Sequence, residues 1–392
     1  MKTKILIAAL AWAGLASAAH AASIDFSGYM RAGTGINARG GTQVCFGLAG
    51  ADTKWRLGNE CDYVIEPNLS AKLASFEGSD WHVHFMPSVY RAWGQTEAGT
   101  DELTARFGQV YAYGTNIAGL ANGKVWAGRR FYNRLQTGIN DQFLEINDGD
   151  GAGIEDMDVG IGKLSIGFMM NGRGPANDNR YALPIRLTGL QTTPSGDLSI
   201  YVTPSGQLKS RDQTTGVDPA DQDNGLAVGL YQRLNGVMGG NWLFGFRHDK
   251  QGELKNTRGI VQFGGKITAG TNLDVVGEYR VRKDAADAGN KWFALGARTD
   301  THISGPFRVL LEVGHDQVKP DDGSGTRHMT KFTLAGAVSA GNEAWSRPTI
   351  RLFVTHAIWN EAARNTLTDR LQQVYGDKKA GTSIGIQAET WW

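Results

Sequence analysis

The sequence predicts an all-β chain whose strands close into a transmembrane antiparallel β-barrel. Three observations carry this prediction. Apolar and polar residues alternate in segments along the whole chain, no run of about twenty apolar residues is present, and the last nine residues alternate and end on tryptophan. A strand has a side-chain period of two, so each such segment has one apolar and one polar face. Because every backbone group in lipid needs a partner, the strands must close on one another to cross a membrane.

The N-terminal residues are typical of a cleaved export signal. Two early lysines precede an apolar stretch over residues 5–16, and an Ala-His-Ala cleavage site follows. We therefore expect a signal peptide over residues 1–21 and a single barrel domain over residues 22–392.

Composition and charge agree with a barrel and weigh against a nucleic-acid partner. The mean hydropathy is -0.32, but lipid-facing and lumen-facing residues cancel in such an average. The 53 glycines and 10 prolines are consistent with many short strands and tight turns. The 40 basic and 39 acidic residues nearly balance, whereas a nucleic-acid-binding protein would have a strongly basic surface.

Six segments show the alternation most clearly. In the first, Phe26, Gly28 and Met30 share a face opposite Tyr29 and Arg31. Each of the others has charged residues opposite an aliphatic face, at residues 62–73, 273–281, 307–316, 345–354 and 384–392. Their lengths are close to the ~9–11 residues that a tilted strand needs to cross a bilayer.

Aromatic residues fall on both kinds of face. Trp242, Phe244 and Phe246 share one face, as the rings of a membrane-interface girdle do. Trp391 lies instead with Glu389 on the polar face of the last strand. A ring that points into a wet lumen suggests a surface along which a ligand slides. The turn-rich stretches are expected to be loops, namely residues 171–185, 202–225 and 360–378.

Cys45 and Cys61 are the only cysteines, and they lie close together in a chain with an export signal. The interpretation is a single disulfide, formed in the periplasm, that closes an outer loop. Two cysteines do not complete a tetrahedral metal shell. His82 and His84 lie two apart on a strand face, but no third ligand is evident. No metal and no other cofactor is therefore expected.

The sequence does not predict an enzyme. A barrel enzyme needs a nucleophile and a base, or a metal, in its lumen. Neither Gly-x-Ser-x-Gly nor His-Glu-x-x-His is present, and paired carboxylates such as Glu145 and Asp148 occur only in a loop.

Several stretches are similar to the maltoporin family of sugar-specific porins. They are IDFSGYMRAG at 24–33, KWRLGNEC at 54–61, WAGRRFYNR at 126–134, GAGIEDMDVGIGKLS at 151–165, WSRPTIRLFVTHAIWNE at 345–361 and the terminal AETWW. The resemblance implies an eighteen-stranded barrel in the outer membrane of a Gram-negative bacterium, in contact with its lipid. It also implies a homotrimer and a third loop that folds inward to constrict the pore.

The resemblance further implies how an oligosaccharide would pass. The family binds sugars along a row of aromatic residues, the greasy slide, beside a polar track that hydrogen-bonds sugar hydroxyls. Pyranose rings stack their apolar C–H faces on aromatic rings, and their hydroxyls need partners outside water. The slide is matched by Tyr29, Trp345 and Trp391, with Trp93 at a position lent to a neighbouring subunit and Phe143 at that of a constriction-loop tyrosine. The polar track is matched by Arg31, Arg56, Glu66, Arg106, Arg134 and Asp141, and the family's first-loop disulfide by Cys45 and Cys61.

The chain also departs from the family pattern. Val64 stands where the family has a slide tyrosine on the second strand, and the last slide position falls near Met238 or Gly239. In the constriction loop, Gln136 and Gly138 replace Asp and His. The expected function is a passive channel for sugars, with maltose and maltodextrins as the first candidates. These departures predict weak binding of maltodextrins, or preference for another sugar.

Other interpretations stay open from the sequence. Trp345 and Trp391 could be interface girdle residues, and Trp93 an ordinary loop residue. Arg31 and the other arginines of the track could form an ion ladder along the lumen wall. A general nonspecific porin would share the barrel without an inward row of rings.

Overall fold

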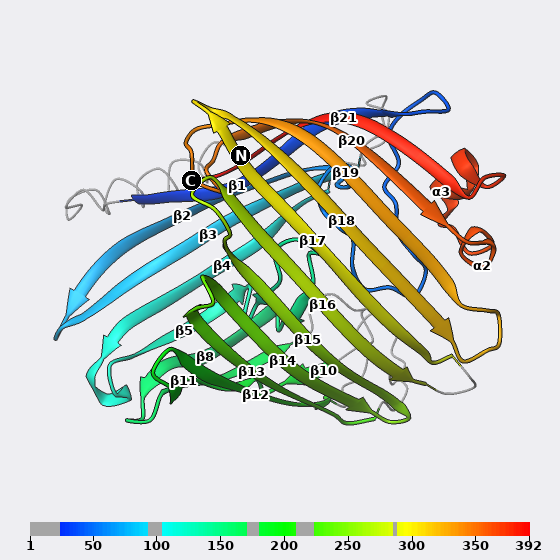
Figure 1. Cartoon of the computed structure of the whole chain (residues 1–392). Helices are drawn as coiled ribbons and strands as arrows, with labels where there is room; N and C mark the ends of the chain where they lie inside the picture. Colours follow the sequence, from blue (N-terminus) through cyan, green and yellow to red (C-terminus); the bar gives the residue numbers. More distant parts are fainter. Residues whose placement is uncertain (1–23, 93–103, 171–179, 209–222, 285–287) are drawn as a thin grey trace, which may run out of the picture.

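Pairing of the first strand with the last closes the sheet into a barrel, and Figure 1 shows these two strands side by side. The computed structural model describes residues 24–92, 104–170, 180–208, 223–284 and 288–392. The expected signal peptide lies outside the described residues. The wall strands are β1 (Ile24–Asn37), β2 (Asp62–Phe76), β3 (Ser79–Ala92), β4 (Thr104–Ile117), β5 (Gly123–Arg130), β8 (Gly149–Asp158), β9 (Lys163–Met170), β10 (Arg180–Ala182), β11 (Ile185–Thr193), β12 (Gly196–Gln207), β13 (Gly225–Val237), β14 (Gly240–Gln251), β15 (Leu254–Lys266), β16 (Thr271–Lys283), β17 (Asn290–Ser304), β18 (Phe307–Pro320), β19 (Arg327–Ser339), β20 (Thr349–Trp359) and β21 (Ala380–Trp391).

These segments make eighteen strand positions in the described wall. β10 and β11 both pair with β9 and β12, so they are two parts of one strand, interrupted at Leu183 and Pro184. Proline has no N–H to donate to the ladder, which explains the break. The predicted all-β antiparallel barrel of eighteen strands is confirmed. Among the described residues, no helix is long and apolar enough to span a membrane.

The predicted alternation of faces is confirmed along the wall. On β20, Ile350 and Leu352 are 52% and 62% exposed, while Arg351 between them is 5% exposed. On β16, Tyr279 is exposed and Arg280 is buried. The exposed apolar side chains face lipid, and the charged side chains face the lumen.

A group of rings lies on the outward face, as the sequence predicts for an interface girdle. The ring centroid of Trp242 lies 5.8 Å from that of Phe244 and 4.8 Å from that of Phe263. Phe246, two residues further along β14, is also exposed.

The loops are shorter than the sequence predicts. Residues 180–182 and 185 are strand, and so are residues 202–207 and Gly225. Thr-Pro-Ser-Gly at residues 203–206 has turn composition, but pairing with β13 supplies partners for its backbone. The expectation of loops there is wrong for these residues; 171–179 and 209–222 lie outside the described residues. Residues 360–378 do form a loop, which contains α2 (Glu361–Arg364) and α3 (Asp369–Tyr375).

Two chain segments fold into the lumen. The constriction segment, residues 131–148 between β5 and β8, carries the small hairpin β6 (Leu135–Gln136) and β7 (Phe143–Glu145). The first inner segment, residues 38–61, joins β1 to β2. The expectation that the disulfide closes an outer loop is wrong, because this segment is buried against the inner wall.

The first inner segment is held by apolar packing and by buried hydrogen bonds. Trp55 is 2% exposed and covers Gly296 and Gly314, where an added Cβ would overlap its ring. Its Nε1 donates to Asp316 of β18 at 2.9 Å. The backbone N–H of Leu57 donates to the Glu312 carboxylate at 3.0 Å. Glycines on the inner face therefore leave the space that the segment fills.

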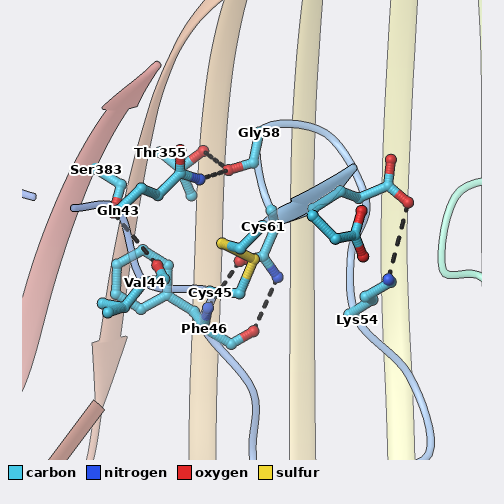
Figure 2. The surroundings of a disulfide bond; sticks show 12 residues. Gln43, Val44, Cys45, Phe46, Lys54, Gly58, Cys61, Thr355 and Ser383 are labelled. Carbon is cyan, nitrogen blue, oxygen red and sulfur yellow. Dashed lines mark hydrogen bonds and ion pairs between the residues drawn. A yellow bond between two sulfur atoms is a disulfide. The ribbon is translucent and has the colours of Figure 1, made fainter. Parts of the chain in front are cut away.

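Cys45 and Cys61 form the predicted disulfide, with Cα atoms 5.9 Å apart. Close to it, the Gly58 carbonyl accepts hydrogen bonds from Gln43 Nε2 at 3.0 Å and from Thr355 Oγ1 at 3.2 Å (Figure 2). The disulfide thus joins the last residue of the first inner segment to Cys45 within it, and the segment is also hydrogen-bonded to β20.

Candidate functional site

Three aromatic residues from separate parts of the chain meet on the lumen face at one end of the barrel. Tyr29 of β1 is the register partner of Trp391 of β21. Trp345 comes from the turn between β19 and β20, and its ring centroid lies 6.4 Å from that of Trp391. The two tryptophans are 38% and 41% exposed, so part of each ring is open to the lumen.

Guanidinium groups lie over the two tryptophans. The Arg347 guanidinium carbon is 4.0 Å from the Trp391 ring centroid and 5.4 Å from that of Trp345. Arg298 of β17 lies 5.6 Å from the Trp345 ring centroid. Arg298 is itself buried on the lumen side, paired with Glu312 at 2.5 Å. These contacts place Trp345 inside the barrel, away from the lipid interface.

A buried carboxylate lies next to the rings. Glu389 is 4% exposed and accepts a hydrogen bond from the Tyr29 hydroxyl at 2.9 Å. It also pairs with Arg56 at 3.5 Å, with Arg347 at 3.2 Å and with Arg351. One carboxylate thus fixes the tyrosine hydroxyl and neutralises several guanidinium groups.

A second group of charges continues from this carboxylate. Arg31 is 6% exposed, donates to the Tyr29 hydroxyl at 2.9 Å, and pairs with Glu60 at 2.7 Å and Asp62 at 2.5 Å. Arg56 pairs with Glu60 at 2.9 Å. We call the whole set the ion cluster, which comprises Arg31, Arg56, Arg347, Arg351, Glu60, Asp62 and Glu389.

Glu60 of the first inner segment is 2% exposed. Burial raises the pKa of Glu60, but Arg56, Arg31 and Lys54 together outweigh that effect and hold the pKa below its ordinary value. Glu60 is therefore ionised at neutral pH, and its charge links the first inner segment to β1.

The constriction segment joins the first inner segment across the lumen. The backbone N–H groups of Lys54 and Arg56 donate to the carbonyls of Asn140 at 3.3 Å and Ile139 at 3.0 Å. The Asp141 carboxylate lies 3.4 Å from the Lys54 amine and 4.0 Å from Arg56. Asp141, predicted from the resemblance, thus lies next to the ion cluster.

The tip of the constriction segment also approaches Trp345, one of the rings predicted for the slide. A Cβ added at Gly138 would lie 3.7 Å from Trp345, which is ordinary contact. The glycine that replaces a family histidine therefore sits directly against a ring. At the other end of the hairpin, Glu145 accepts from the Tyr231 hydroxyl at 2.7 Å and pairs with Arg247 of β14.

The remaining predicted residues lie apart from this group. Glu66 of β2 is half-buried and accepts from Ser88 Oγ at 2.8 Å. Arg106 is exposed on β4, where it is the register partner of Ser88. Trp93 lies outside the described residues.

Two predicted residues of the constriction segment contact each other. The Arg134 guanidinium pairs with Asp148 and lies 3.3 Å from the Phe131 ring centroid and 5.2 Å from that of Phe143. The structure thus brings together Tyr29, Arg31, Arg56, Asp141, Trp345 and Trp391, with Glu66, Arg106, Arg134 and Phe143 around them.

The positions that depart from the family pattern supply no further ring. Val64 is inward and half-buried as the register partner of Arg31. Met238 is 85% exposed in the turn between β13 and β14.

The two histidines of β3 do not form part of a metal site among the described residues. His84 Nδ1 is hydrogen-bonded to Ser70 Oγ at 2.7 Å. The described residues contain no group of three potential metal ligands.

Sequence reasoning missed several members of the ion cluster. The alternation of strand faces places Glu389, Arg347 and Arg351 on the lumen side. That the two arginines converge on the Glu389 carboxylate follows only from the register of β1, β20 and β21. Glu60 had no periodic signal, because it lies outside the strands. Its position beside Cys61, where the disulfide fixes the chain, was the available clue.

Comparison with known proteins agrees with this architecture. The family model described as LamB porin matches residues 24–392. The chain is similar to the crystal structure of OccAB1 from Acinetobacter baumannii, with TM-score 0.55, 7% identity and coverage of 94% of this chain and 96% of that one. It is also similar to OpdK of Pseudomonas aeruginosa with vanillate, with TM-score 0.54, 8% identity and coverage of 94% and 99%.

A third similar structure is OccD3 (OpdP) of Pseudomonas aeruginosa, with TM-score 0.53, 10% identity and coverage of 94% and 91%. At these identities the similarity of the solved structures concerns the fold alone. The family match spans all but the first 23 residues. The chain belongs to the LamB porin family and is a channel of the Gram-negative outer membrane.

Proposed function

We propose that this porin is a passive channel for sugars, with maltose and maltodextrins as the first candidates. The supporting observation is the meeting of Tyr29, Trp345 and Trp391 on one lumen face, with exposed ring surface beside fixed charges. Each ring can stack on one face of a pyranose for about 1 kcal/mol, on the scale of aromatic contacts. Weak sites in series suit transport, because a sugar must leave as readily as it enters.

In this proposal the polar track has two parts. Arg31 and Arg56 mainly hold the Tyr29 hydroxyl and the first inner segment through the ion cluster. The more exposed Arg106 and Arg134, together with Glu66, exchange hydrogen bonds with sugar hydroxyls. Phe143, beside Arg134, offers a ring without a hydroxyl on the constriction segment.

The proposal is tested by block of single-channel current in planar bilayers. Trp391→Ala should weaken block by malto-oligosaccharides roughly fivefold, the equivalent of one lost stacking contact. Ion conductance should stay unchanged or rise slightly, because a ring is removed and no charge is lost. The matched control is Trp242→Ala, which removes the same side chain from the lipid face. Equal block in wild type and Trp391→Ala would contradict the proposal.

A general porin is the second candidate, favoured by the absence of a ring at Val64 and at the exposed Met238. Liposome swelling with sugars of graded size separates the two. A general porin would admit them in order of size alone, whereas a slide would admit malto-oligosaccharides faster than their size predicts. We also propose assembly as a trimer, in which Trp93 reaches a neighbouring channel. A monomer after gentle detergent extraction would contradict that.

A further inference from the structure

A second group of rings lines the lumen on strands that the proposed slide does not use. His82 and His84 of β3 are register partners of Tyr113 and Tyr111 of β4. The His82 and Tyr113 rings are stacked, with centroids 4.7 Å apart and planes inclined by 3°. The His84 and Tyr111 centroids are 4.8 Å apart, and those of the two tyrosines 5.5 Å. We call this group the four-ring surface.

The four-ring surface faces the lumen and is open to it. Val83 and Phe85, which alternate with the two histidines along β3, are exposed on the lipid side. All four rings are half-buried, whereas Trp126 and Tyr132, which pack against the two tyrosines, are only 1% exposed. β2 ends and β3 begins at the end of the barrel where β1 begins. The surface therefore lies toward the same end as Tyr29 and Trp391.

Apart from His84, which is hydrogen-bonded to Ser70 and Gln109, the polar groups of this surface are free to bind a ligand. Within the described part of the chain, the hydroxyls of Tyr111 and Tyr113 and the ring nitrogens of His82 make no side-chain hydrogen bond. The slide differs, because the Tyr29 hydroxyl donates to Glu389 and accepts from Arg31. These groups can therefore exchange hydrogen bonds with a ligand at no cost to an existing network.

A cation without a counter-ion lies beside the rings. The Lys124 amine of β5 is 5.6 Å from the Tyr113 ring centroid and has no ion pair among the described residues. Its register partner Glu155 is already paired with Arg130 at 2.6 Å and Arg186 at 3.0 Å. The nearby Asp80 and Arg130 also have partners of opposite charge.

The surrounding charges leave the surface positive. Asp80, at the start of β3, pairs with Lys72 at 2.6 Å. Arg130 lies 4.9 Å from the Tyr111 ring centroid, and Glu155 serves as its counter-ion. Lys124 is therefore the charge that an incoming anion would meet next to the half-buried Tyr113 ring.

We propose that the four-ring surface and Lys124 form a second binding site, for a sugar that carries an anionic group such as a phosphate or a carboxylate. The pyranose packs its apolar face against the uncovered edges of the Tyr113 and Tyr111 rings, whose faces are covered by His82 and His84. The free hydroxyls and His82 bind the sugar hydroxyls, and Lys124 binds the anion. This goes beyond the proposed function, whose slide takes neutral sugars on other residues. It does not depend on that slide.

The test uses the full-length channel in planar bilayers at low salt, where screening is weak. The probe is glucose 6-phosphate, with glucose and inorganic phosphate measured alongside. Lys124→Gln should weaken block by glucose 6-phosphate about three- to tenfold and leave glucose unchanged. Tyr113→Leu should weaken block by glucose 6-phosphate and leave inorganic phosphate unchanged. Tyr113→Phe, which keeps the ring, should retain most of the block.

The matched control is Lys266→Gln, which removes a cation away from the four-ring surface, where Lys266 pairs with Glu343. It should leave block by glucose 6-phosphate unchanged, and normal ion conductance confirms that each variant forms a channel. Wild-type block by inorganic phosphate equal to that by glucose 6-phosphate would overturn the proposal, and so would block that is insensitive to Lys124→Gln. Trp391→Ala separates the two proposals, since it should leave the Lys124-dependent block intact.

Discussion

Replacing Glu389 with glutamine tests whether the ion cluster holds the rings of the proposed slide in place. The carboxylate is 4% exposed and contacts the Tyr29 hydroxyl, Arg347 and Arg351. Glutamine has almost the same shape and can still accept from the tyrosine. The change therefore removes the charge and little of the packing.

The expected loss of stability follows from the positive charges that remain on Arg347 and Arg351 after the carboxylate is removed. Among the described residues, Arg347 and Arg351 have no carboxylate partner other than Glu389. Removing one member of a buried ion pair costs about 3–5 kcal/mol, because the remaining charge is left uncompensated. Burial already lowers the pKa of Arg347 to about 10, and Glu389 opposes that effect. We expect Glu389→Gln to lower the free energy of unfolding by about 3–5 kcal/mol.

The assay is denaturant unfolding of the refolded barrel in detergent, followed by tryptophan fluorescence. The matched control is Glu343→Gln in the turn that carries Trp345 and Arg347. Glu343 pairs with Lys266 at 2.7 Å, but both side chains are more than half exposed, so the expected loss of stability is much smaller than for Glu389→Gln. Equal losses in the two variants would refute the reasoning. A reversal potential that fails to shift toward anions in Glu389→Gln would refute it as well, because the variant removes a lumen anion.

Three further predictions concern the first inner segment. Gly314→Ala should displace Trp55 at a cost of about 1–3 kcal/mol, seen as a change in tryptophan fluorescence and faster proteolysis, whereas Gly336→Ala, with open space around it, should change neither. Cys45→Ser should still insert into membranes, with loss of up to ~3 kcal/mol in the chain-entropy model; failure to insert would contradict this. The pKa of Glu60 lies below its ordinary value, so its stabilisation is present above pH 4.5 and is lost as the pH falls below that value. Channel noise should rise only there, and Glu60→Gln should abolish the step.

The wall of the barrel could be predicted from sequence because its signal is local. Ile350, Arg351 and Leu352 show which side faces lipid by position alone, and the same holds along most strands. The meeting of Tyr29 with Trp391 also followed, since the two ends of a closing barrel must pair. The disulfide followed from the cysteine count and spacing.

The contents of the lumen could not be predicted in the same way. Phe46, Trp55 and Leu57 lie in an aperiodic stretch, so no pattern indicated where their apolar surface is buried. The site where the Trp55 ring packs is set by two wall residues, Gly296 and Gly314, whose lack of a Cβ leaves room for the ring. An apolar loop and an inward glycine pair are each ambiguous alone. Only their juxtaposition, over 240 residues apart in the chain, identifies the contact.

Trp345 shows how strain and position together support a functional interpretation. Its φ of 67° is in the left-handed region, which a bulky side chain adopts at a cost of about 1–3 kcal/mol. The cost is offset by contacts that the chain could not make otherwise, with Arg298, Arg347 and Trp391. A residue that served only as a membrane girdle would need none of these partners, because lipid accepts a tryptophan in any relaxed turn. The strained turn instead holds the ring opposite Gly138, where the constriction segment leaves room for it. The strained turn therefore supports the proposal that the exposed face of the ring is used from within the lumen.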